Sequence, residues 1–149
     1  MSRSYFSVLE VEQLIPSLER IFIHVLQLRA SMRQQEMLLE KAGVRMSRDL
    51  LGDDDDPRER IDVRQAKGLF KAYYEALGEE LSKVRDLGGE VKDMDTGLVD
   101  FPGKRGDEEI LLCWRLGEKS LGFWHTAEAG YAGRRPIDDQ VPREPTRLD

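Results

Sequence analysis

The first half of the chain alternates apolar and polar residues with the period of an α-helix. Between residues 16 and 43 the apolar positions recur at steps of three, four and seven, with arginine and glutamine between them. Ser7 and Glu10 have the spacing of a capping box, so a helix is expected to begin there. Pro16 predicts a kink that separates a short opening helix from one long amphipathic helix, which ends near Gly43.

A second helical pattern runs from about Arg58 to Leu87, and Gly88 and Gly89 close it. Each helix would be on the order of 40 Å long at the standard rise per residue. Because the two lengths are similar, residues 4–88 are predicted to form an antiparallel helical hairpin. Its connector, residues 46–58, carries four consecutive aspartates followed by a proline, which is typical of a mobile, solvated loop.

The hydrophobic period changes after the glycine pair. Short apolar and aromatic runs, separated by Gly, Pro, Asp and Lys, are typical of antiparallel strands. The predicted fold class is therefore α+β: a long antiparallel helical hairpin followed by a small antiparallel β-meander, residues 89–135, packed on it. Residues 136–149 contain three prolines and few apolar residues, so they are predicted to form a disordered tail after a single domain of residues 1–135.

A hairpin with a four-residue loop is predicted between Leu116 and Leu121. In that register Trp114 faces Phe123, and both lie on the surface that packs against the helices. In the same register Leu112 faces His125, so His125 shares the face of Trp114 and Phe123. Cys113 then points to the opposite face of the sheet, away from His125. We therefore expect Cys113 to be a small buried apolar residue and not a nucleophile.

Composition excludes several classes of function. The 149 residues include 29 acidic and 23 basic side chains, and the net charge of −6 argues against a nucleic-acid partner. A single cysteine excludes an intramolecular disulfide. No run is apolar for the length that a membrane span needs, and no signal-like apolar segment precedes the first charges, so a cytoplasmic protein is expected.

Polar residues near the second half of the sheet are the candidates for chemistry. If residues 125–128 formed one helical turn, His125 and Glu128 would share a side, and with Asp100 they would offer three ligands to zinc or iron(II). The alternative is a structural histidine at a strand end that is hydrogen-bonded to a carboxylate. Neither pattern is specific enough to decide between the two.

Two arginines suggest a different kind of site. Arg134 follows a glycine-rich stretch, and together with Arg115 it would suit a small anionic ligand. The alternative is that one arginine pairs with Asp100 or Glu118 and ties the turn down. The residues that packing alone does not explain are thus Asp100, Glu118, His125 and Arg134.

Several short motifs occur together and in order, namely YFSVLEVEQLIPSL, VKDMDTGLVDFP, LLCWRLGE, FWH and GYAGRRP. In this combination the chain resembles the bacterial domain of unknown function 2203 family, some of whose members carry the label division initiation protein. The resemblance implies a small bacterial protein with a helical hairpin and a sheet, and no established activity. The residues in the shared pattern are Asp100, Trp114, Glu118, Trp124, His125, Gly130, Gly133 and Arg134.

The first functional hypothesis is a non-catalytic interaction or scaffold protein that forms a homodimer. Ile23, Leu26, Leu38 and Tyr74 fall outside the main apolar stripes, and pairing two hairpins into a four-helix bundle would bury them. The second hypothesis is a metal-binding protein or metal-assisted enzyme, and the third is a small anionic-ligand binder. The sequence leaves open whether the protein is an enzyme.

Overall fold

The structure, a computed structural model, describes residues 5–44 and 58–145. The four aspartates of the predicted acidic loop lie outside the described residues. The chain divides into two compact units, residues 1–22 with 82–149 and residues 23–81. Each unit contains part of both long helices, and each is described separately below.

Helix α1 spans Val8–Lys41 and begins at the predicted capping box. The Ser7 N–H donates to Glu10 Oε1 at 3.0 Å, and the Glu10 N–H donates to Ser7 Oγ at 3.3 Å. Pro16 lies inside the helix, so the predicted break at this proline is wrong. Proline removes one backbone hydrogen bond, but the neighbouring Ile15 and Leu18 are 3% and 0% exposed, and their packing keeps the helix continuous.

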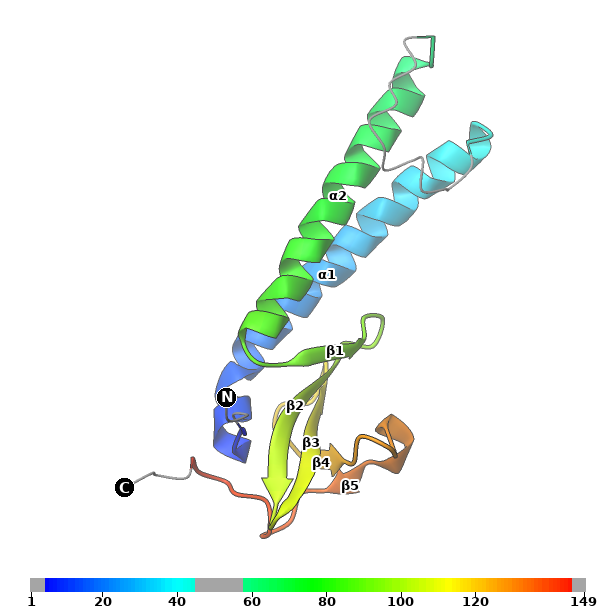
Figure 1. The fold of residues 1–149 in the computed structure, drawn as a ribbon. Coiled ribbons are helices and arrows are strands. Elements are labelled where there is room, and N and C mark those ends of the chain that lie inside the picture. The colour runs from blue at the N-terminus through cyan, green and yellow to red at the C-terminus, as the bar shows by residue number, and fades with distance from the viewer. Residues whose placement is uncertain (1–4, 45–57, 146–149) are drawn as a thin grey trace. The chain divides into compact units, whose positions relative to one another are not determined.

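The unit of residues 23–81 pairs α1 with helix α2, Ile61–Asp86, in the predicted antiparallel hairpin (Figure 1). No helix in the described ranges is both long enough and apolar enough to cross a membrane. Glycines with positive φ, Gly43 at 78° and Gly88 at 99°, terminate the two helices as expected. One core cluster of this unit consists of Leu39, Val63, Ala66 and Phe70, with Met32 and Val44 packed against it.

The other unit contains a five-stranded antiparallel sheet in which the strands follow one another in chain order (Figure 1). The predicted β-meander and the α+β fold class are thereby confirmed. A short 3-10 helix, η2, Tyr131–Gly133, lies between the last two strands. The strands are β1 Glu90–Asp93, β2 Leu98–Arg105, β3 Glu108–Arg115, β4 Phe123–His125 and β5 Arg135–Pro136.

One face of this sheet packs against the beginning of α1. The Phe101 ring meets Phe6 edge-on with centroids 5.1 Å apart, and the Trp114 ring lies 6.2 Å from that of Phe22. Phe101, Trp114 and Phe22 are fully buried. Each such side chain contributes roughly 1.5–3 kcal/mol as an upper bound. These contacts hold the sheet on the first turns of the helix.

The predicted register of β3 and β4 is wrong by one residue. Leu112 lies opposite Trp124, Cys113 opposite Phe123 and Leu111 opposite His125. The strands are joined by residues 116–122, a longer loop than predicted, in which the Trp114 Nε1–H donates to the Glu118 carbonyl oxygen at 2.9 Å. Since a shift of one residue moves every side chain to the other face, Phe123 leaves the α1 side of the sheet and Cys113 joins the face of His125.

Residues 136–145 are ordered, contrary to the prediction of a disordered tail from residue 136. Val141 is 1% exposed. The Val8 N–H donates to the Pro142 carbonyl oxygen at 3.0 Å, and the Leu9 N–H donates to the Arg143 carbonyl oxygen at 2.9 Å. The first amides of a helix have no partner within the helix, so this segment satisfies two of them.

Candidate metal centre

Three neighbouring strands bring Asp100, Cys113 and His125 together. Asp100 on β2 lies opposite Cys113 on β3, and Cys113 lies opposite Phe123 on β4. Because side chains alternate along a strand, His125 points to the same face as Phe123 and reaches the same place. One ligand atom from each of the three residues lies within 4.8 Å of the other two.

All three side chains are buried, since Asp100 is 2%, Cys113 0% and His125 3% exposed. Asp100 Oδ1 lies at hydrogen-bond distance, 3.0 Å, from His125 Nε2. Asp100 Oδ2 has no hydrogen-bond partner among the described residues. A buried carboxylate oxygen without a partner is costly, by about 1–3 kcal/mol or more. The carboxylate is therefore only half satisfied by the protein around it.

The hydrogen bonds of His125 determine which ring nitrogen carries a proton. His125 Nδ1 lies 2.7 Å from the carbonyl oxygen of Thr126, and a carbonyl only accepts, so Nδ1 is the donor. Nε2 then faces the Asp100 carboxylate, and two acceptors repel each other unless a proton or a cation lies between them. An imidazole whose Nδ1–H is held by a backbone carbonyl presents Nε2 in the orientation common at metal sites.

Cys113 is a protonated thiol in the absence of a cation. Burial, followed by the negative charge of Asp100, raises the pKa of Cys113 to about 12, although the Arg134 guanidinium acts in the opposite direction. A thiol with this pKa is a poor nucleophile at neutral pH. A coordinating metal would deprotonate it outright and would supply the positive charge that the carboxylate and the thiolate both need.

Arg134 closes the loop after β4 and is held by Glu118. Its Nη2 donates to both Glu118 carboxylate oxygens, at 2.7 and 3.0 Å, and to the Cys113 carbonyl oxygen at 3.0 Å. The guanidinium also lies over the rings of Phe123, at 4.2 Å, and Tyr131, at 4.9 Å. Burial opposes the charged form, but the Glu118 hydrogen bond, the charge of Glu118 and a contribution from Cys113 together raise the pKa of Arg134. This arginine ties the turn down, as the structural alternative predicted.

The structure unites two of the three predicted metal ligands and replaces the third. Asp100 and His125 lie together as expected. Glu128 is exposed in a turn at residues 127–129, which begins after β4 ends at His125 and is closed by the Gly130 N–H donating to the Thr126 carbonyl oxygen at 3.2 Å, so Glu128 is outside the cluster. Arg115 is also exposed, and its Nη1 donates to the Tyr131 hydroxyl at 3.3 Å.

Cys113 is the member of the buried cluster that sequence reasoning missed. The prediction that it points away from His125 is wrong, because that prediction depended on the shifted register. The alternation of β3 was correct, and the error lay only in how β4 pairs with it. Pairing Leu112 with Trp124, two large apolar residues, was the available signal for the correct register.

The family can now be assigned. A family model described as "Uncharacterized conserved protein (DUF2203)" matches residues 4–137. The chain belongs to this family. The match includes the whole cluster of Asp100, Cys113 and His125 and confirms the resemblance that the motifs indicated. No curated protein and no solved structure matches the chain. The description of the family assigns no activity to its members, so the function has to be argued from the site.

Proposed function

We propose that this member of the family binds one zinc ion at Asp100, Cys113 and His125. The observation that carries the proposal is the buried cluster itself, with ligand atoms within 4.8 Å of one another and one carboxylate oxygen without a partner. The ion would join β2, β3 and β4 across the sheet.

The donor set favours zinc. Thiolate, imidazole and carboxylate are its usual ligands, at about 2.0–2.3 Å, which places tetrahedral ligand atoms roughly 3.3–3.7 Å apart. Rotations that move each atom by about 1 Å would therefore convert the observed cluster into a coordination shell. Three protein ligands leave a fourth position for water or a substrate, as in catalytic zinc sites. Iron(II) would accept the imidazole and the carboxylate and is the competing ion.

A purely structural bond between His125 and Asp100 is the main competing explanation. It accounts for Nε2 and Oδ1, which lie 3.0 Å apart. A hydrogen bond from the Cys113 thiol to the carboxylate would account for the cysteine, but neither bond accounts for Asp100 Oδ2, which is buried without a partner among the described residues. A divalent cation would satisfy both oxygens and the sulfur at once.

Elemental analysis of protein purified without chelators tests the proposal. We expect about one zinc per chain, and a rise in melting temperature when Zn²⁺ is added to chelator-stripped protein. An ion present at 100 times its dissociation constant would stabilise the fold by about 2.7 kcal/mol. Cobalt(II) substitution should produce a thiolate-to-metal absorption band, which is a direct signature of Cys113 as a ligand.

Matched variants separate coordination from loss of fold. Cys113→Ser keeps the size of the side chain and should lose the cobalt band and most of the affinity. Glu128→Gln changes the exposed residue that sequence reasoning assigned as a ligand, and it should bind metal like the wild type. Zinc well below one per chain, together with a melting temperature that Zn²⁺, Fe²⁺ and Mn²⁺ leave unchanged, would refute the proposal.

A second candidate function is homodimerisation through the helical hairpin. Ile23, Leu26 and Leu38 on α1 are 51%, 41% and 55% exposed, and Tyr74 on α2 is 49% exposed. All four lie in the unit of residues 23–81. A second copy of the same hairpin would bury these side chains in a four-helix bundle, which supports an interaction or scaffold role.

Light scattering at micromolar concentration tests this second candidate. We expect a dimer for the wild type, and a monomer for Leu26→Glu because the new charge would be buried at the contact. Gln27→Glu adds the same charge at the adjacent exposed position and is the control. A monomeric wild type, or equal effects of the two variants, would exclude the proposed surface.

A further inference from the structure

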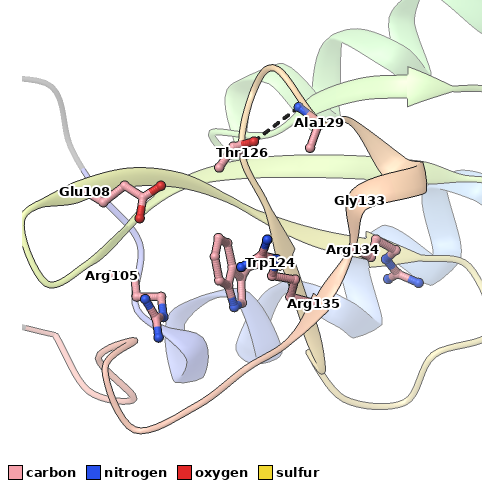
Figure 2. A pocket seen from close by; sticks show the side chains of 8 residues that line it. All are labelled: Arg105, Glu108, Trp124, Thr126, Ala129, Gly133, Arg134 and Arg135. Atoms are coloured by element: carbon pink, nitrogen blue, oxygen red, sulfur yellow. Dashed lines mark hydrogen bonds between the residues drawn. The ribbon is translucent and has the colours of Figure 1, made fainter.

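A hollow of about 380 Å³ lies beside the last two strands of the sheet (Figure 2). Arg105 and Glu108, at the ends of β2 and β3, form one side of it, and Trp124 and Arg135, paired across β4 and β5, form another. A volume of this size is typical of small-molecule sites. The hollow does not include any residue of the metal cluster.

Two guanidinium groups are held against one indole ring here. Arg105 Cζ lies 5.3 Å and Arg135 Cζ 5.6 Å from the centroid of Trp124, a side chain that is itself 4% exposed. The indole is fixed in turn, since its Nε1–H donates to the Pro136 carbonyl oxygen at 3.1 Å. The ring therefore has two cationic side chains beside it, and both line the hollow, so the hollow attracts negative charge.

Only one of these cations is compensated by the protein. Arg105 donates to Asp138 Oδ2 from Nε at 3.1 Å and from Nη2 at 2.8 Å, and its Nε also donates to Asp138 Oδ1 at 3.3 Å. Arg135 has no carboxylate partner in the part of the chain that the structure describes. Arg134 also lines the hollow, but its guanidinium points away from Trp124 (Figure 2). It donates to Glu118 instead.

We propose that this hollow binds a small molecule through an oxyanion, a carboxylate or a phosphate, held by Arg135 with Arg105 beside it. A guanidinium presents a planar fork of donors that matches both oxyanions. The Glu108 carboxylate, on the opposite side of the hollow, would repel a second negative charge on the ligand. It would accept a hydrogen bond from a donor group on the same ligand. The proposal is independent of the metal centre, because the two sites share no residue.

Calorimetric titration of the whole protein with inorganic phosphate, and separately with acetate, tests the proposal at constant ionic strength. We expect saturable binding that Arg135→Gln weakens about tenfold or more, because a charge-assisted hydrogen bond is lost. Arg135→Lys keeps the charge but not the fork and should retain part of the affinity. Glu108→Gln should bind phosphate several-fold more tightly, because a repelling carboxylate is removed.

Arg85→Gln is the control, since it makes the same charge change at an exposed position in the last turn of α2. Its affinity for either ion should equal that of the wild type. The comparison of phosphate with acetate identifies the preferred oxyanion. Absence of saturable binding by both ions, or equal losses in Arg85→Gln and Arg135→Gln, would overturn the proposal.

Discussion

The bond between Glu118 and Arg134 predicts a measurable contribution to stability. The Glu118 carboxylate accepts from Arg134 Nη2, and its Oε1 also accepts from the backbone N–H of Arg115 at 2.7 Å. The side chains of Glu118 and Arg134 are 23% and 12% exposed. Glu118→Gln removes the negative charge but keeps the size of the side chain, so it isolates the charge-assisted part of these bonds.

The magnitude follows from burial and geometry. Exposed ion pairs contribute about 0–1 kcal/mol, whereas hydrogen bonds to charged groups out of water contribute about 1.5–3 kcal/mol. Arg134 would keep its positive charge in a mostly buried position after the substitution, which adds a desolvation cost. We therefore expect Glu118→Gln to lower the free energy of unfolding by about 2 kcal/mol.

A double-mutant cycle of Glu118→Gln and Arg134→Gln, measured by urea unfolding, gives the coupling energy between the two side chains. A chelator in the buffer removes any contribution from bound metal. The coupling energy should be about 1.5 kcal/mol or more. Glu128→Gln makes the same chemical change at an exposed residue of the loop after β4 and should change stability by less than about 0.5 kcal/mol. A coupling energy indistinguishable from zero would refute the assignment of Arg134 to a structural bond.

Three further predictions concern other parts of the fold. In folded, chelator-stripped protein the Cys113 thiol should resist alkylation at pH 7 and react on unfolding, because burial raises its pKa to about 12; rapid stoichiometric labelling of that folded protein would contradict this. The hydrogen bond from Arg105 lowers the pKa of Asp138 below its ordinary value of 3.8. This carboxylate therefore stabilises the fold at pH values above 3.8, and its contribution is lost as the pH falls through the lowered pKa. Unfolding curves of wild type and Asp138→Asn should therefore converge in acid, and a constant difference would exclude the linkage. Gly97→Ala should destabilise by about 1–3 kcal/mol, because its φ is +70° and a Cβ would lie 2.6 Å from the Cβ of Leu116. Gly78→Ala, in open helix, should instead be neutral or stabilising in the same assay.

Local patterns determined the elements of this protein. The capping residues Ser7 and Glu10, the glycines that end both helices and the change of hydrophobic period after Gly89 each act within a few residues of chain. Such signals are readable without coordinates, because the physical causes, hydrogen-bond geometry and side-chain periodicity, are themselves local. They also placed Asp100 near His125, since antiparallel order alone brings those strand positions to one end of the sheet.

Tertiary contacts decided what the local patterns left open. Packing of Ile15 and Leu18 carries α1 through Pro16, and backbone bonds to the start of α1 order the segment that proline content predicted to be disordered. The register of β3 and β4 depends on a loop held by Trp114 and Glu118, because both registers pair large apolar residues: the predicted one would pair Trp114 with Phe123, and the observed one pairs Leu112 with Trp124. A one-residue shift in that pairing hardly changes which apolar residues face each other, but it moves every side chain of the strand to the other face of the sheet. Only the assembled sheet could therefore place Cys113 beside Asp100 and His125.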